Sequence, residues 1–175
     1  MDISKNYFEL FALPVSFSID LNLLSAHYIE LQKTLHPDRH AHLSDRERRL
    51  AEQYTAYLNE ALTTLRTPLS RAQYLLELEG LDVRSESSVA IDPGFLMQQM
   101  MLRERLEEIP DQAEPFDELD VLSEEVEDAL KLLREHFSVQ YGQQHYTDAA
   151  VIVRKMQFLE KLAVEIERLE DRLDD

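Results

Sequence analysis

Apolar residues recur every three or four positions along almost the whole chain, the spacing that gives an α-helix one apolar face. No segment alternates apolar and polar residues with the period of two that a half-buried strand requires. Helix-breaking residues stand where these patterns begin or end. Thr67-Pro68 and Asp92-Pro93 have the form of helix starts, and Gly80 and Gly142 have the form of helix ends. The sequence therefore predicts an all-α protein.

Two of the helical patterns follow one another in the N-terminal half. The first pattern stops before His36-Pro37, and its apolar stripe is Leu24, Tyr28, Leu31 and Leu35. The second opens at Ser44, which together with Glu47 has the form of a capping box. Its stripe is Leu50, Tyr54, Tyr57, Leu58, Ala61 and Leu65. We expect these two helices to form an antiparallel hairpin joined by a loop over residues 36–43.

The C-terminal half predicts three more amphipathic helices, over residues 93–109, 116–141 and 147–173. Such helices bury their apolar stripes by packing as an antiparallel three-helix bundle. A polar, Ser-rich stretch separates the two halves and is typical of a domain boundary. The sequence thus predicts an N-terminal domain over 1–78, a linker over 79–91 and a C-terminal domain over 92–175.

Charge and composition narrow the classes of function. The net charge of −17 opposes binding to nucleic acid, because that binding depends on Lys and Arg displacing counterions. Residues 1–78 hold 8 basic and 10 acidic side chains, whereas residues 79–175 hold 10 and 25, which indicates two different partners. The absence of Cys excludes thiolate-bound zinc, iron–sulfur ligation and cysteine nucleophiles in this chain.

No apolar run approaches the roughly 20 residues that cross a bilayer. The N-terminal residues also lack the basic and apolar regions of a secretory signal. We therefore expect a cytoplasmic protein that makes no membrane contact.

The loop between the first two long helices contains His36-Pro37-Asp38. Proline forces the preceding residue out of helical geometry, so His36 should end its helix and Asp38 should begin an exposed turn. Alone, the tripeptide fits a simple helix stop. With His40 and His42 the loop also reads His-x-Asp-x-His-x-His, a set of side chains that can ligate zinc or another divalent ion for hydrolysis. The loop residues leave these interpretations open.

The first helix of the C-terminal half carries more apolar side chains than one buried stripe needs. A core stripe is already supplied by Phe95, Leu102, Leu106 and Ile109. The apolar residues left over are Leu96, Met97, Met100, Met101 and, on the last helix, Phe158. Flexible Met side chains suit a surface that adapts to a partner. The pattern predicts an exposed interaction patch that includes an exposed aromatic ring. The alternative is that these residues pack between the domains or inside the bundle.

Four features in order make the N-terminal part resemble J-domains: Tyr7-Phe8-Glu9-Leu10-Phe11, a helix-loop-helix, His36-Pro37-Asp38 in its loop, and Tyr57-Leu58-Asn59-Glu60-Ala61. The resemblance implies that His36 and Asp38 engage the ATPase domain of a DnaK-type chaperone, while Pro37 holds the turn. It also implies electrostatic docking by nearby basic residues, and the candidates are Lys33, Arg39 and His27. The sequence departs from the usual pattern at Leu35, where J-domains commonly have Tyr.

Four segments extend the resemblance over essentially the whole chain: residues 64–76, 95–99, 102–109 and 154–162. With them the sequence resembles the HscB family, the J-type co-chaperones of iron–sulfur cluster assembly. The resemblance implies a protein that is not an enzyme and holds no cofactor. It would deliver the cluster scaffold IscU to the chaperone HscA and stimulate ATP hydrolysis there.

The positions that match the family's scaffold contact are Leu96, Met97, Met100, Glu104, Glu108 and Phe158. Met101 stands where relatives can have an acidic residue. Two other functions stay open from the sequence: a general J-protein that recruits many unfolded clients, and a metal-dependent hydrolase built on the loop histidines.

Overall fold

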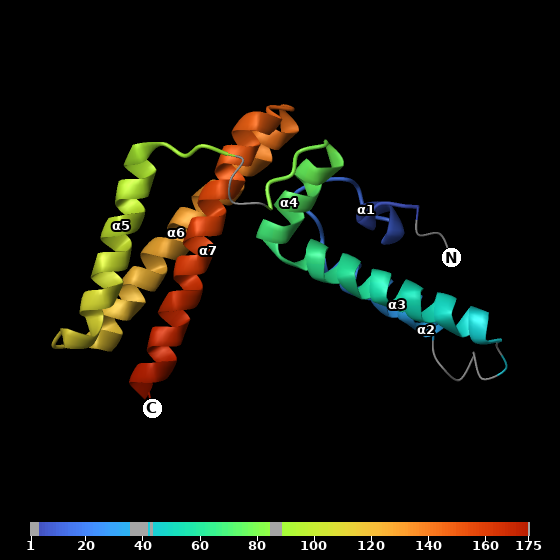
Figure 1. Cartoon of the computed structure of the whole chain (residues 1–175), viewed down its shortest axis with the longest axis horizontal. Coiled ribbons are helices and arrows are strands. Elements are labelled where there is room, and N and C mark those ends of the chain that lie inside the picture. Colours follow the sequence, from blue (N-terminus) through green and yellow to red (C-terminus); the bar gives the residue numbers. More distant parts are fainter. Residues whose placement is uncertain (1–3, 36–41, 43, 85–88, 175) are drawn as a thin grey trace. The chain divides into compact units, whose positions relative to one another are not determined.

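The computed structural model describes residues 4–35, 42, 44–84 and 89–174. Across these residues the regular secondary structure is entirely helical, which confirms the all-α prediction. In chain order (Figure 1) the helices are α1 (Tyr7–Leu10), α2 (Leu21–Thr34), α3 (Asp45–Arg66), α4 (Pro68–Leu78), α5 (Pro93–Glu108), the short 3-10 helix η2 (Ile109–Asp111), α6 (Pro115–Gly142) and α7 (Tyr146–Asp174).

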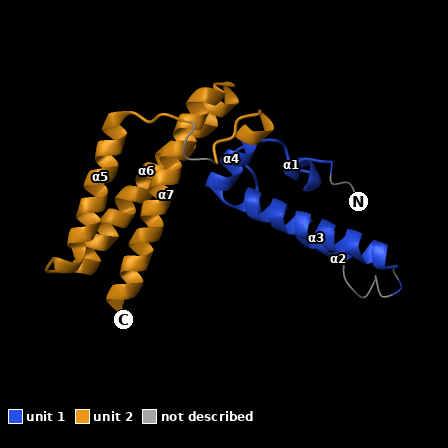
Figure 2. Cartoon of the chain, viewed as in Figure 1, with its two compact units in different colours: residues 1–75 blue, residues 76–175 orange. Residues whose placement is uncertain are grey.

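The chain divides into two compact units, Met1–Leu75 and Leu76–Asp175, which Figure 2 colours separately. The division falls inside α4, so the first unit holds α1, α2, α3 and most of α4. The second unit holds the end of α4 and all later helices. The functional ranges expected from the sequence (1–78, 79–91 and 92–175) stay predictions.

The first unit is built on the predicted hairpin of α2 and α3 (Figure 1). The Asp20 side chain caps α2 by accepting hydrogen bonds from two backbone N–H groups of the first turn. At the start of α3 the predicted capping box is present: Ser44 N donates to Glu47 Oε2 (2.9 Å), and Glu47 N donates to Ser44 Oγ (3.4 Å). The hydroxyl of Tyr28 donates to Asn59 Oδ1 (2.8 Å) and joins the two helices. The buried stripe residues of the pair are Leu24, Leu35, Tyr54, Leu58, Ala61 and Leu65.

A cluster of tyrosines attaches α1 to this hairpin and to α4. The ring of Tyr7 stacks on Tyr74 (4.4 Å between centroids) and meets Tyr57 edge-on (5.4 Å). The backbone N–H of Tyr7 donates to the hydroxyl of Tyr74 (3.0 Å), and the Tyr57 hydroxyl donates to the Lys5 carbonyl (2.5 Å). Phe8, next in the chain, is fully buried. The short helix is therefore held by side-chain packing, since one helical turn is not stable by itself.

The turn from α3 into α4 depends on a buried arginine. Pro68 disfavours helical geometry at Thr67, so α3 ends at Arg66 and α4 starts at Pro68. Nη1 of Arg71 donates to the Leu65 carbonyl (2.7 Å), and its guanidinium lies 5.1 Å from the ring centre of Phe17. This side chain satisfies a carbonyl at the end of α3 that has no helical partner, and it packs the loop before α2 against the turn.

In the second unit, α6 and α7 pack against each other along their length, and α5 packs against both (Figure 1). This arrangement is the predicted antiparallel three-helix bundle. The side chains buried in it include Leu106, Ile109, Leu119, Leu122, Val126, Leu130, Phe137, Val153, Met156, Leu159, Leu162 and Ile166. The observed bounds of the three helices differ from the predicted ones by one residue at most ends, apart from the 3-10 turn that begins at Ile109.

The segment after α4 packs on the bundle. Gly80 ends α4 in the left-handed conformation (φ 83°), and Leu81 N donates to the Leu76 carbonyl (2.9 Å). Val83 is buried, and its carbonyl accepts a hydrogen bond from Gln157 Nε2 on α7 (2.7 Å). The described first part of the expected linker, residues 79–84, is therefore anchored to α7.

Two details of the sequence prediction are wrong. Leu50, assigned to the buried stripe of α3, is 53% exposed, because the buried stripe of α3 begins only at Tyr54, about one helical turn further on. Gly142 is the last residue of α6, but the left-handed residue is Gln144 (φ 62°). Two more residues continue the last turn of the helix before His145 N closes the end by donating to the Gln140 carbonyl (2.9 Å).

The tyrosine cluster predicts how stability depends on alkaline pH. Burial, followed by the charge of Glu60, raises the pKa of Tyr7 from 10.0 to about 12. The unfolded chain loses the Tyr7 hydroxyl proton at a lower pH than the folded chain does. The contribution of Tyr7 to the free energy of unfolding is therefore fully present below pH 10 and is lost as the pH rises towards about 12. Tyr7→Phe should make the decline in folding stability between pH 10 and about 12 less steep, as measured by denaturant unfolding of the wild-type protein and the variant in this pH range. An equally steep decline in the variant would contradict the assignment.

Candidate partner-binding surfaces

Part of the predicted chaperone-binding set lies outside the described residues, namely His36, Pro37, Asp38 and Arg39. The remaining two candidates are on α2. Lys33 is exposed in the last turn, where a cation is favourable, and its Nζ is 2.9 Å from Glu30 Oε1. The hydrogen bond from Lys33 lowers the pKa of Glu30.

His27, the other candidate on α2, makes an internal contact. Its Nδ1 donates to the Phe11 carbonyl (2.5 Å), and the ring is half-buried. This hydrogen bond ties α2 to the chain that follows α1. His27 therefore has a structural partner inside the first unit, a contact that the sequence did not reveal.

The alternative metal site depends on the same loop. His36, Asp38 and His40 lie outside the described residues, and His42 is exposed. Among the residues that the structure describes, no group of three or more His, Asp or Glu side chains is placed to hold a metal ion.

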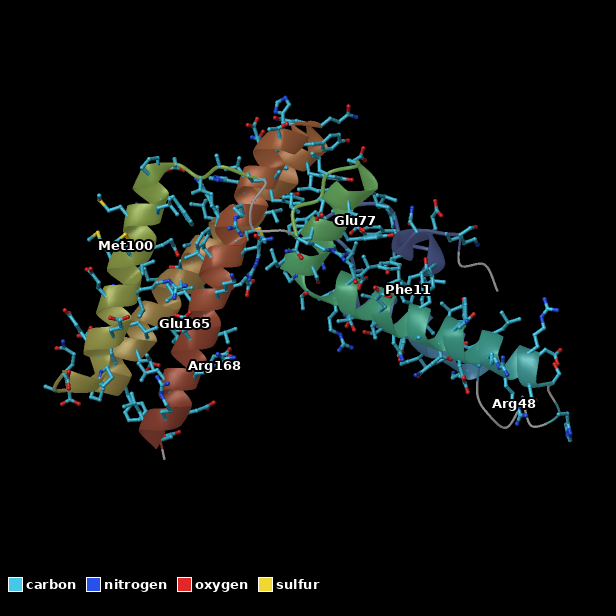
Figure 3. All side chains as sticks on the ribbon, in the orientation of Figure 1. Phe11, Arg48, Glu77, Met100, Glu165 and Arg168 are labelled. Carbon is cyan, nitrogen blue, oxygen red and sulfur yellow. The ribbon has the colours of Figure 1, made fainter. Side chains whose placement is uncertain are left out.

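Helix α5 has two stripes of residues on opposite sides, one buried and one facing solvent. The buried stripe combines Phe95, Gln99, Leu102 and Leu106, and Ile109 at the start of η2 continues it; Gln99, Leu106 and Ile109 are buried and the other two half-buried. The stripe towards solvent repeats at three- and four-residue intervals and consists of Met97, Met100, Met101, Glu104 and Glu108. Met97, Met100 and Met101 are 66%, 63% and 63% exposed, and Leu96, at the edge of this stripe, is 40% exposed. In Figure 3 the side chain of Met100 points away from α6 and α7.

Phe158 joins α7 to the first turns of α5. Its ring meets Phe95 edge-on, with 6.1 Å between centroids. On α7 the guanidinium of Arg154 lies 4.9 Å from the centre of the Phe158 ring. Phe158 is therefore half-buried, and the expectation of an exposed aromatic ring is wrong, because Phe95 and Arg154 cover part of it.

A salt bridge fixes the start of α5 against α7. Lys155 Nζ is 2.9 Å from Asp92 Oδ1 and 5.2 Å from the ring centre of Phe95. The carboxylate of Asp92 also caps α5 by accepting a hydrogen bond from Phe95 N (3.0 Å). Hydrogen bonds from Lys155 and from the backbone of Phe95 lower the pKa of Asp92. The exposed stripe of α5 is thereby presented by a helix whose N-terminus is held in place.

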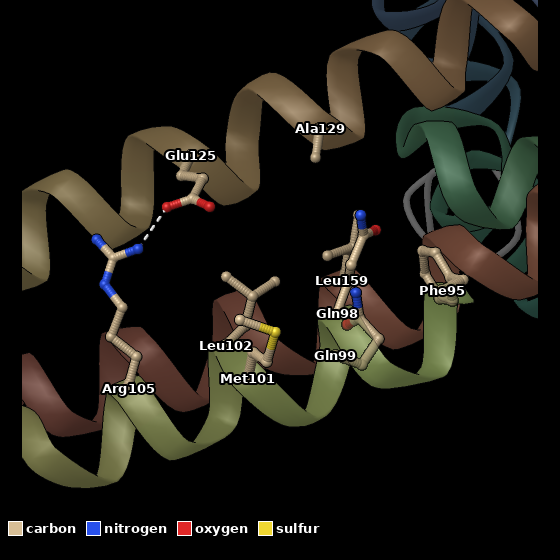
Figure 4. Close-up of a pocket in the computed structure, with 9 residues that line it drawn as sticks. All are labelled: Phe95, Gln98, Gln99, Met101, Leu102, Arg105, Glu125, Ala129 and Leu159. Atoms are coloured by element: carbon tan, nitrogen blue, oxygen red, sulfur yellow. Dashed lines mark hydrogen bonds and ion pairs between the residues drawn. The ribbon is translucent and has the colours of Figure 1, made fainter. Parts of the chain in front are cut away.

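A groove of about 340 Å³ lies between α5 and α6, on the side of α5 away from Phe158 (Figure 4). Arg105 Nη1 bridges the two helices by donating to Glu125 Oε2 (2.6 Å). Met101 lines this groove, whereas Phe158 lies on the α7 side of α5. The lining residues are Phe95, Gln98, Gln99, Met101, Leu102, Arg105, Glu125, Ala129 and Leu159.

The comparisons with known proteins agree with one another. A family model described as the HSCB C-terminal oligomerisation domain matches residues 91–167. A co-chaperone protein HscB homolog of Aliivibrio salmonicida is 44% identical over 168 residues, which cover 96% of this chain and 98% of the relative. The chain belongs to the HscB family of co-chaperones.

Solved structures of HscB proteins have the same fold. The chaperone HscB from Vibrio cholerae superposes with a TM-score of 0.87 at 41% identity, covering 97% of this chain and 99% of that one. The human co-chaperone protein HscB gives a TM-score of 0.89 at 28% identity, with 97% and 84% covered. Among the described residues of this HscB-family protein, no helix is long and apolar enough to cross a membrane.

Sequence reasoning missed the residues around Phe158. Arg154 precedes Phe158 by four positions on a helix, a spacing that places both on the same face and could have indicated the contact. The Asp92–Lys155 pair joins residues far apart in the chain, and no local pattern indicates it.

The two faces of α5 predict opposite effects on stability. Met97→Ala should change the free energy of unfolding by no more than about 0.5 kcal/mol, because this side chain already contacts solvent. Leu106→Ala on the buried face should cost about 2–5 kcal/mol. Denaturant unfolding of both variants is the measurement, and a comparable loss for Met97→Ala would place that residue in the core.

Proposed function

We propose that this protein delivers the iron–sulfur scaffold IscU to the DnaK-type chaperone HscA and stimulates ATP hydrolysis there. The observation that carries the proposal is the exposed Met-rich stripe on α5, in a chain similar over its whole length to HscB co-chaperones. Three Met side chains of this stripe are more than 60% exposed, so most of their surface is not buried in the bundle. Exposed apolar patches of this kind mark protein-binding sites.

The two units have separate tasks in this proposal. In the first, His36, Pro37 and Asp38 contact the chaperone, and Lys33, Arg39 and His27 support that contact electrostatically. In the second, the scaffold binds Leu96, Met97, Met100, Met101, Glu104, Glu108 and Phe158. The different charge balance of the two parts of the chain supports two partners of different surface chemistry.

The chemistry itself takes place on the partners. ATP is hydrolysed by the chaperone, and the iron–sulfur cluster is cargo carried by the scaffold. This protein acts as an adaptor in the cytoplasm, without a cofactor of its own and without a covalent step. Its contribution is to bring the two partners together, which raises the effective concentration of one at the other.

A conservative change in the loop tests the chaperone contact. Asp38→Asn should abolish stimulation of HscA's ATPase, because the amide keeps the shape of the side chain but removes its charge. Helix content by circular dichroism and binding of IscU should stay unchanged. His36→Gln should behave in the same way. Full stimulation by Asp38→Asn would refute the proposed role of the loop.

Truncation on α5 tests the scaffold contact. Leu96→Ala and Met97→Ala should each weaken IscU binding by about 1–2 kcal/mol, roughly five- to thirtyfold, as measured by calorimetric titration. Basal stimulation of the chaperone without IscU should be retained, and only the additional stimulation by IscU should be lost. A protein that captured many denatured chains in a pull-down, and no single folded scaffold, would instead be a general J-protein.

A further inference from the structure

Three contacts in series connect Val83, through residues of α7, to the candidate scaffold surface. This surface consists of the residues proposed to bind the scaffold: Leu96, Met97, Met100, Met101, Glu104, Glu108 and Phe158. Gln157 is buried, and its Nε2 donates to the Val83 carbonyl (2.7 Å). Its Oε1 accepts a hydrogen bond from Nη1 of Arg154 (2.9 Å). The guanidinium of Arg154 in turn stacks over the ring of Phe158. Arg154 is thus held at one edge by an amide and on one face by an aromatic ring.

The charge of Arg154 has no anionic partner among the described residues. The other half-buried arginines of the second unit differ from it, because Arg103, Arg105 and Arg134 each lie within 4 Å of a Glu carboxylate. Arg154 instead contacts a neutral amide and an aromatic ring. These contacts orient the guanidinium without neutralising it, although it is half-buried.

A guanidinium in this state is prepared to bind a carboxylate. Arginine has five N–H donors in a rigid planar fork that matches two carboxylate oxygens. The contact with Gln157 accounts for one donor, at Nη1. Because the side chain is already oriented, little conformational entropy is lost when an anion binds.

The position of Arg154 relates this charge to the apolar surface. Phe158, which Arg154 covers, contacts Phe95, and Phe95 is the neighbour of Leu96 in the chain. Arg154 therefore lies next to the part of the surface that Phe158 forms, beside the first turn of α5. Glu104 and Glu108 lie about 12 Å or more beyond Leu96 along α5. Apart from the Asp92–Lys155 pair, in which the two charges offset each other, the surface has the positive Arg154 at one end, apolar residues in the middle and Glu104 and Glu108 at the other.

We propose that Arg154 is a specificity-determining residue of the scaffold contact and binds a carboxylate of the scaffold. This inference rests on the proposed function, since it assumes that the scaffold binds this surface. The opposite charges at the two ends fix the direction in which the scaffold lies along α5. An oppositely oriented scaffold would place like charges together.

The test compares two charge-removing substitutions on the same helix. Arg154→Gln should weaken binding of IscU to the full-length protein roughly tenfold in calorimetric titration, because one charge-assisted contact is lost. It should also reduce the dependence of affinity on salt concentration, which loss of packing alone would not do. Arg154→Met keeps an unbranched chain over Phe158 without the charge, so it should reproduce both effects if Arg154→Gln fails to fold.

The matched control is Arg168→Gln, an exposed arginine on α7 (labelled in Figure 3). It removes the same charge about 21 Å along the helix from Arg154. That distance exceeds the Debye length of about 8 Å at physiological salt. Affinity and salt dependence should therefore equal those of the wild-type protein.

A double-mutant cycle identifies the partner group. Acidic residues of IscU are replaced singly by their amides, and one such change should weaken binding to the wild-type protein but not further weaken binding to Arg154→Gln. The inference is overturned if Arg154→Gln binds like the wild type while Met97→Ala is weakened, and the proposed function then stands. It is also overturned if Arg168→Gln loses as much affinity, which would indicate a general charge effect. If the wild-type protein does not bind IscU at all, the proposed function fails as well.

Discussion

The packing of α6 against α7 is the interaction on which the second unit depends. Both helices are long and contribute continuous apolar stripes, and the fully buried side chains between them include Leu122, Leu130, Phe137, Val153 and Met156. Burial of each large apolar side chain contributes about 1.5–3 kcal/mol. Because this pair buries so much of the core, α5 needs only one of its faces for packing. Its opposite face can carry apolar residues that serve a partner.

The charged residues of the second unit serve its geometry more than its stability. Arg103 pairs with Glu165 (2.5 Å) and Arg105 with Glu125 (2.6 Å), which links α5 to both neighbouring helices. Such exposed pairs contribute only about 0–1 kcal/mol each, so the apolar core supplies most of the stability. What the pairs add is a preferred position of α5 relative to α6 and α7. A binding surface composed of residues from α5 and α7 depends on that position.

The first unit is organised around the two ends of its loop. Leu35 is buried at the end of α2, and the Ser44–Glu47 capping box starts α3. The buried Arg71 and the tyrosine cluster hold the other end of the hairpin. The helix ends on both sides of the loop are therefore defined by buried and capping side chains.

The sequence alone determined the helices and most of their buried faces. Helical periodicity and local capping signals depend on residues within a few positions of one another. For this reason the Ser44–Glu47 box, the Asp92 cap and the bounds of α6 and α7 could be predicted closely. The surplus of apolar residues on α5 was also a local signal, and the exposure of Met97, Met100 and Met101 agrees with it.

The tertiary structure decided what surrounds these side chains. In the folded protein Phe95 and Arg154 cover part of Phe158. His27 donates a hydrogen bond to the Phe11 carbonyl, and Gln157 donates one to the Val83 carbonyl. Each contact except that of Arg154 joins residues at least 16 positions apart in the chain. Such contacts depend on how whole helices pack, and a local pattern contains no information about that packing. The sequence therefore determined which residues were available for binding, and only the packing of the helices decided which charge lies beside them.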